Sequence, residues 1–149
     1  MQFETTTCIT QHNKELLEMY ANKFNITISD FITSLIHYAI LCEKQKPKTF
    51  KNITYRKRKK DEWERIHLYL RHHEYEFLLD MKKMWKMSVA LLIEYCIENV
   101  LQEFVKRLLQ EDDTYSYRFK AYTFKFEKVY GFHSYQIIWG LPPEIMEKT

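Results

Sequence analysis

The sequence contains only two glycines and three cysteines among its 149 residues. Two glycines cannot form a glycine-rich phosphate loop, and no set of nucleophile, base and orienting group is recognisable, so we expect no enzyme and no cofactor. The cysteines, Cys8, Cys42 and Cys96, are far apart and fit neither the spacing of metal ligands nor an even disulfide framework. They are therefore predicted to be reduced thiols.

Long apolar runs are also missing. No stretch approaches the roughly 20 apolar residues that span a bilayer. The N-terminus has neither the basic nor the apolar region of a signal peptide. These patterns predict a cytoplasmic protein with no membrane partner.

Hydrophobic residues make up 46% of the chain and aromatic residues 16%, which is enough for one sizeable core with an appended segment. The net charge of +3 hides a segregation, because residues 44–60 hold nine Lys or Arg and no acid. The other residues hold 14 bases and all 20 acids, a net charge of −6. The basic block is either a solvated linker or an arm that attracts polyanions such as nucleic acid.

The chain contains an internal repeat. Shifted by 61 residues, the first third matches the middle third, apolar position on apolar position, for about 37 residues without a gap. Phe24 falls on Trp85, for example, and Ile32 falls on Ile93. Two copies are too few for a solenoid, so we expect the two halves to bury their apolar faces against each other.

Each copy shows the signals of a strand followed by two helices. In the second copy, apolar residues alternate with polar or aromatic ones, as in Arg65, Ile66, His67, Leu68, Tyr69 and Leu70. Thr10 is a predicted N-cap of the first helix of copy one, and Thr27 and Ser88 are predicted N-caps of the second helix of each copy. After Ser88 the apolar stripe continues unbroken to Leu109, whereas the helix after Thr27 ends near Cys42.

The C-terminal part is rich in Tyr and Phe with a period of two. Tyr115, Tyr117 and Phe119 lie in one phase and Tyr122, Phe124 and Phe126 in the other, so a bulge or a strand covered on both faces is expected near Ala121. Gly131 predicts a turn and Tyr135, Ile137 and Trp139 a returning strand, which together make a hairpin. This hairpin could cap the longer helix, bind a partner protein through its edge, or sense a ligand.

A strand and two helices, with an alternating strand and a hydroxyl cap, resemble the ribbon-helix-helix superfamily of Arc, methionine-repressor and plasmid copy-control DNA-binding proteins. The resemblance covers about residues 3–43 and 64–104. It implies that the two strands pair antiparallel into a ribbon that enters the DNA major groove, with both halves of the usual dimer in one chain. The implied fold is mainly α with short β: a first motif at 1–43, a basic linker at 44–62, a second motif with an extended helix at 63–110, and a hairpin extension at 111–149.

The resemblance also implies which residues touch DNA. Base-reading side chains are expected on the outer face of the ribbon, namely Glu4, Thr6, Cys8, Arg65, His67 and Tyr69. Phosphates are expected at the starts of the second helices, at Thr27, Ile28, Ser29, Ser88, Val89 and Ala90. The basic segment, residues 44–60, is expected to add phosphate contacts from Arg56, Lys57, Arg58, Lys59 and Lys60. Because the two outer faces differ, the target is predicted to be an imperfect palindrome.

Two other classes of function are alternatives to DNA binding. His72 and His73 near His67 suggest a metal site, although histidines at such a junction more often face solvent or a phosphate, and we predict no metal. The main alternative is a protein-interaction adaptor, similar to an antitoxin, whose C-terminal sheet grips a partner protein. A regulator of transcription, or a plasmid or conjugation accessory factor, remains the first prediction. It would act as a monomeric pseudo-dimer, as a homodimer, or as a higher assembly on DNA.

Overall fold

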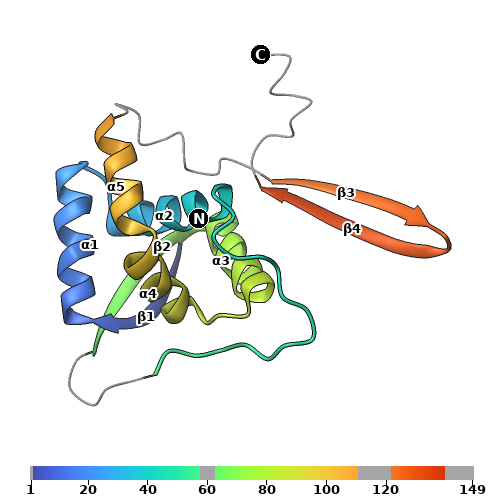
Figure 1. Cartoon of the computed structure of the whole chain (residues 1–149), viewed down its shortest axis with the longest axis horizontal. Coiled ribbons are helices and arrows are strands. Elements are labelled where there is room, and N and C mark those ends of the chain that lie inside the picture. The colour runs from blue at the N-terminus through green and yellow to red at the C-terminus, as the bar shows by residue number, and fades with distance from the viewer. Residues whose placement is uncertain (1, 58–62, 111–121, 140–149) are drawn as a thin grey trace. The chain divides into compact units, whose positions relative to one another are not determined.

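The computed structural model describes residues 2–57, 63–110 and 122–139, which form five helices and two antiparallel two-stranded sheets. The architecture is thus mixed α and β (Figure 1). The chain divides into two compact units, residues 1–118 and 119–149. The first holds β1 (Gln2–Thr10), α1 (Gln11–Lys23), α2 (Ile28–Leu41), β2 (Trp63–Arg71), α3 (His72–Trp85), α4 (Val89–Asn99) and α5 (Leu101–Gln110), and the second holds β3 (Tyr122–Val129) and β4 (Phe132–Trp139).

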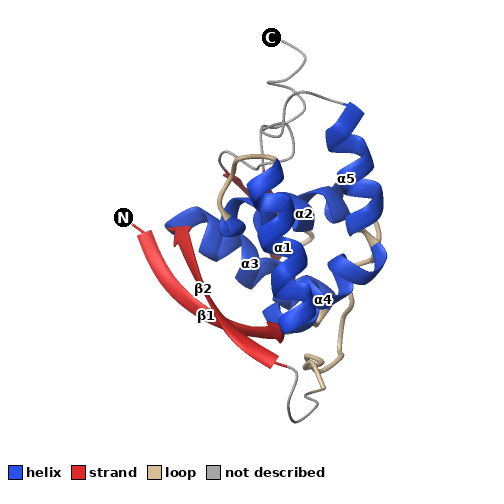
Figure 2. Cartoon of the chain, turned by 90° about the vertical axis from the view of Figure 1, so that its left-hand side faces the viewer, coloured by secondary structure: helices blue, strands red, loops and turns tan. Residues whose placement is uncertain are grey.

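The strands of the two repeat copies pair with each other. β1 and β2 form an antiparallel ribbon in which Thr6 lies opposite His67. These two residues are also equivalent in the 61-residue repeat, so the register is symmetric with respect to the two copies. The ribbon lies along one side of the helices of this unit (Figure 2).

The period-two pattern decides which face of the ribbon is buried. Ile66, Leu68 and Leu70 are at most 5% exposed, and Ile9 on β1 is 1% exposed. They pack against the helices and their alternate neighbours face outward, as the alternation in β2 predicts. Thr7 is also buried, so the Thr-rich β1 obtains its inner face from small polar residues as well as from Ile9.

All three predicted N-caps are confirmed. The hydroxyl of Thr10 accepts a hydrogen bond from the Asn13 N–H at 3.1 Å, and Thr27 and Ser88 do the same for the first turns of α2 and α4. α3 begins differently, because the Glu74 carboxylate accepts from the Arg71 N–H at 3.0 Å. The cap of α1 by Thr10 and the cap of α3 by Glu74 thus each give an acceptor to a backbone N–H at the start of the first helix of a copy.

The turn between the two helices of each copy contains a left-handed residue. Asn25 has φ 55° and Lys86 has φ 56°. A lysine in this conformation costs about 1 kcal/mol. Here the basic segment supports it, because the carbonyl of Lys86 accepts a hydrogen bond from the Thr54 N–H at 2.8 Å.

The described part of the basic segment is attached to the second copy rather than solvated throughout. The Lys48 N–H donates to the Met84 carbonyl at 2.8 Å, and the Thr54 carbonyl accepts from the Ser88 N–H at 2.9 Å. Thr54 also forms an isolated parallel bridge with Met87. These backbone bonds hold the segment against the turn between α3 and α4.

The long helix predicted from Val89 to Leu109 is interrupted. α4 ends at Asn99, and Val100 has φ −126° and ψ −30°, outside the helical region. The Asn99 side chain donates to the Tyr95 carbonyl at 3.0 Å, an alternative to regular helix bonding. After the break, Phe104 of α5 stacks on Tyr38 of α2 with ring centroids 5.2 Å apart. The apolar stripe continues through the break, so periodicity alone could not locate it.

The second unit is a hairpin, and the predicted turn at Gly131 is confirmed. Tyr130 (φ 51°) and Gly131 (φ 82°) form a two-residue turn with positive φ at both positions, which suits the twist of a hairpin. The predicted residues Tyr115, Tyr117 and Phe119, and the phase change near Ala121, lie outside the described residues.

Among the described residues no single helix is long and apolar enough to span a bilayer, and α1 and α2 meet that criterion only as a pair bent by 97°.

Candidate nucleic-acid interface

The ribbon brings the six predicted base-reading residues onto one face. Opposite pairs are formed by Glu4 with Tyr69, Thr6 with His67, and Cys8 with Arg65. Five of the six are exposed, and Cys8 is half-buried. The result is a two-stranded outer surface with hydroxyl, carboxylate, imidazole, guanidinium and phenol groups on adjacent positions.

A contact between a carboxylate and an imidazole crosses this face, and sequence reasoning missed it. The Glu4 carboxylate lies 2.8 Å from Nδ1 of His67, and both side chains are about half exposed. The two residues are diagonal neighbours, because His67 stands opposite Thr6 rather than Glu4. Only the register of the two strands could have revealed this pair, since its members are 63 positions apart in the sequence.

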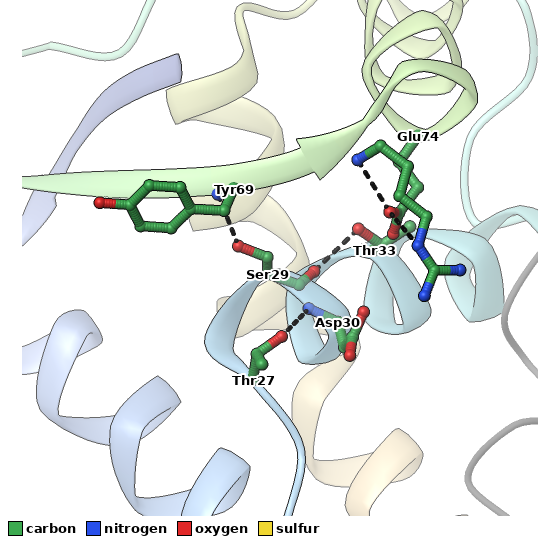
Figure 3. A network of polar contacts seen from close by, with 7 residues as sticks. Thr27, Ser29, Asp30, Thr33, Tyr69 and Glu74 are labelled. Atoms are coloured by element: carbon green, nitrogen blue, oxygen red, sulfur yellow. Dashed lines mark hydrogen bonds and ion pairs between the residues drawn. The ribbon is translucent and has the colours of Figure 1, made fainter. Parts of the chain in front are cut away.

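At one edge of the ribbon, α2 is fastened to β2 by a side chain. The hydroxyl of Ser29 accepts a hydrogen bond from the Tyr69 N–H at 3.1 Å, and Ser29 is 8% exposed (Figure 3). The Thr33 hydroxyl donates to the Ser29 carbonyl at 2.8 Å, and Thr27 caps the helix through the Asp30 N–H. The start of α2, with the predicted phosphate ligands Thr27, Ile28 and Ser29, therefore lies beside the ribbon.

At the other edge, the start of α4 lies beside β1 but without such a contact. Ala90 occupies the repeat position of Ser29, and Cys8 occupies that of Tyr69. An alanine methyl group cannot accept a hydrogen bond. A pocket of about 410 Å³ lies here, lined by Thr5–Cys8 of β1, Tyr55 and Arg56 of the basic segment, four residues of α3, and Ser88–Ala90.

Arg56, which is predicted to contact a DNA phosphate, has its side chain turned inward rather than toward the surface. Its side chain is only 6% exposed, and Nη1 lies 3.5 Å from the Glu94 carboxylate. The backbone bonds of Thr54 draw this part of the segment inward. Lys57 is exposed as expected, whereas Arg58, Lys59 and Lys60 lie outside the described residues.

Other reactive groups serve the core or pair locally. Cys96 is fully buried, and burial raises the pKa of its thiol to about 12, which disfavours the nucleophilic thiolate. Nε2 of His72 pairs with the Glu76 carboxylate at 2.7 Å. Within residues 2–57, 63–110 and 122–139, no three or more His, Cys, Asp or Glu residues gather as they would around a metal ion.

The hairpin of the second unit has one strongly apolar face. Its opposite pairs are Tyr122 with Trp139, Phe124 with Ile137, and Phe126 with Tyr135. Phe124 is 58% exposed and Tyr135 is 66% exposed. A two-stranded hairpin is marginally stable alone in water, so a face of this kind favours contact with another surface.

Comparison of the chain with models of protein families, with characterised proteins and with solved structures found no match. Proposals about its function therefore depend on the residues and contacts described above.

Proposed function

We propose that this protein binds double-stranded DNA sequence-specifically by placing the β1–β2 ribbon in the major groove. In this proposal the two repeat copies are tandem ribbon-helix-helix motifs that form a pseudo-dimer within one chain. The protein would serve as a transcriptional regulator or as a plasmid or conjugation accessory factor.

The observation that carries the proposal is the register of the ribbon. It is symmetric about the pair of Thr6 and His67, so equivalent residues of the two copies project at equal distances from that pair. A two-stranded ribbon fits the major groove, which is about 12 Å wide. A duplex with two similar half-sites is the target that such a surface complements.

The outer side chains have the chemistry to distinguish bases. The guanidinium of Arg65 can bind the O6 and N7 acceptors of guanine, and the hydroxyl of Thr6 can contact a base edge or a thymine methyl group. Glu4 can accept from a cytosine amine only when it releases His67. Since copy one carries Glu4, Thr6 and Cys8 where copy two carries Arg65, His67 and Tyr69, the two half-sites should differ.

The starts of α2 and α4 flank the two edges of the ribbon and suit phosphate contacts. First-turn N–H groups lack partners within a helix, and the helix dipole favours an anion there. Backbone amides of Ile28 and Ser29 at one edge, and of Val89 and Ala90 at the other, are the proposed clamps. Lys57 adds an exposed positive charge.

The test is a binding selection from random duplex DNA at about 150 mM salt, where nonspecific phosphate attraction is weakened. Wild type is compared with the double variant Arg65→Ala, Tyr69→Ala. The matched control is Lys23→Ala, Met19→Ala, which removes one positive charge and one large side chain from exposed positions on α1. We expect wild type and the control to enrich a short imperfect palindrome that the ribbon variant fails to enrich. Failure of wild type to enrich any motif would contradict the proposal.

The apolar face of the hairpin favours a second candidate, an adaptor that binds another protein. Replacing Phe124 and Tyr135 by serine would remove such an interaction and leave DNA selection unchanged. Replacing Arg65 would do the reverse. The pair of results separates a DNA reader from an adaptor, because the two surfaces share no residue.

A further inference from the structure

We propose that the apolar face of the β3–β4 hairpin is the contact surface of a homodimer, in which the hairpins of two chains stack face to face. The strand register assigns the side chains to two faces, because residues opposite each other project to the same side and successive residues alternate. The apolar face carries Tyr122, Phe124, Phe126, Tyr135, Ile137 and Trp139. The other face carries Ser134, Gln136 and a pair formed by Lys125 and Glu127, whose charged groups lie 3.1 Å apart. The hairpin thus has one face suited to water and one suited to burial.

The rings of the apolar face contact one another and still remain exposed. The ring centroids of Phe126 and Tyr135 are 5.1 Å apart, as are those of Tyr122 and Trp139. Phe126 is nevertheless 53% exposed and Tyr135 is 66% exposed. A two-stranded hairpin is marginally stable in water, and a second layer packed on its apolar face would stabilise it.

The area of the face is sufficient for a dimer. Its exposed members, Tyr122, Phe124, Phe126, Tyr135 and Ile137, have exposed fractions between 42% and 66%. Since a large side chain of this kind buries about 200 Å² when fully covered, these residues offer roughly 500 Å² on one chain and roughly 1,000 Å² in a symmetric pair. This total lies near the lower limit for a specific interface between proteins, so a dimer of moderate affinity is expected.

The exposed apolar residues of the first unit favour a second hairpin as the partner surface. In the described part of that unit they are Met19 on α1, Leu41 on α2, Tyr69 on β2, Leu79 on α3 and Leu109 on α5, with Phe50 and Tyr55 in the basic segment. No helix or strand there supplies more than one of them, and single exposed apolar side chains are usual on protein surfaces. Among the described elements, only the hairpin of another chain offers a matching apolar face.

The two ends of the face differ in chemistry, which favours one direction of stacking. Lys128 and His133 stand opposite each other near the turn, and Tyr122 and Trp139 stand opposite each other at the open end. A two-fold axis that places the two turns at opposite ends puts the basic residues of each chain over the aromatic pair of the other. A lysine ammonium group is attracted to the faces of Trp and Tyr rings. Because Lys128 and Tyr122 are six positions apart, this arrangement also separates the two basic ends by about 20 Å.

Sedimentation equilibrium of the full-length protein without DNA tests the proposal. We expect wild type to dimerise with a Kd of about 10 µM. The variant Phe126→Ser, Tyr135→Ser removes one opposite pair from the apolar face and is expected to weaken dimerisation at least about 30-fold. The matched control, Lys125→Ser, Gln136→Ser, removes the neighbouring opposite pair from the polar face and should leave the Kd unchanged.

A second variant separates the contact between chains from the formation of the hairpin. Lys128 is exposed, so Lys128→Gln should leave the hairpin intact. Loss of the ammonium group over the aromatic pair is expected to weaken dimerisation about fivefold. Lys125→Gln removes the same charge from the polar face and should have no effect.

Three results would overturn the proposal. The first is a wild-type protein that remains monomeric at about 200 µM, which would mean that the face is covered by its own chain or by a different protein. The second is equal dimerisation of wild type and the variant Phe126→Ser, Tyr135→Ser. The third is an unchanged Kd in Lys128→Gln, which would contradict the stacking of basic residues on the aromatic pair. Because the experiment contains no DNA, its outcome does not depend on DNA binding by the ribbon.

Discussion

The two edges of the ribbon, built from equivalent parts of the repeat, have diverged. At the edge of β2, Ser29 of α2 binds the Tyr69 N–H and seals the contact. At the edge of β1, Ala90 of α4 and Cys8 both line a pocket, and Arg56 of the basic segment is also among its lining residues. One repeat position therefore closes the contact between helix and strand in the first copy and borders a pocket in the second. Duplication of a motif keeps the pairing of its strands while releasing single edge positions for other uses.

The largest effects on stability are expected when equivalent core residues of the two copies are truncated. Phe31 and Leu92 occupy the same repeat position and are both fully buried. We expect Phe31→Ala to lower the free energy of unfolding by about 4 kcal/mol and Leu92→Ala by about 3 kcal/mol. Because the two copies interleave through β1 and β2, each variant should still unfold in one transition. Urea unfolding followed by circular dichroism measures both quantities, and a second transition in either variant would show that the copies are independent.

A smaller effect is expected at the sealed edge. Ser29→Ala removes the acceptor of the Tyr69 N–H and should lower the free energy of unfolding by about 1 kcal/mol. The converse change, Ala90→Ser, breaks no existing bond and should alter stability by less than about 0.5 kcal/mol. Thermal unfolding of the two variants side by side tests this difference. Equal losses in both would mean that the bond of Ser29 contributes nothing specific.

The smallest effect is expected from an acid-dependent contact present in one copy only. Lys44 lies 2.6 Å from Glu103, and with the Tyr38 hydroxyl it lowers the pKa of the Glu103 carboxyl. The repeat position of Glu103 in the first copy is Cys42, which has no carboxylate. A lowered pKa in the folded state means that the stabilisation is present above the unfolded pKa and is lost as the pH falls through the folded one.

Glu103→Gln should therefore lower the melting temperature slightly at pH 7 and by less at pH 3, so the melting temperatures at the two pH values differ less in the variant than in wild type. The effect is small because the pair is partly exposed and screened by solvent. Melting curves between those pH values, with Glu98→Gln as the exposed control on α4, measure it. A constant difference between wild type and Glu103→Gln at every pH would rule out this linkage.

Much of the local structure could be predicted because it depends on near neighbours. The hydroxyl caps at Thr10, Thr27 and Ser88 act within three residues. The two faces of β2 follow from strict alternation. Each of these features is a short-range property of the backbone that a linear pattern records.

Other features needed partners that are distant in the sequence. The break at Val100 could not be predicted, because the apolar stripe is the same on both sides of it. In the sequence Arg56 is one residue of a basic block. The backbone bonds of Thr54 with Lys86 and Ser88 hold this part of the chain where Arg56 lies near Glu94. The contact between Glu4 and His67 could be found only from the register of the ribbon.

Linear patterns account for the repeat, the strand and helix order of each copy, and the outward face of the ribbon, since hydrophobic period and capping chemistry depend on residues close together in the chain. Which edge of the ribbon is closed and which borders a pocket follows from the packing of distant segments instead. That outcome depends on whether one side chain has an acceptor for an N–H of another strand, and on where a distant segment packs. Such contacts between remote parts of the chain set the pocket, the burial of Arg56 and the course of α5.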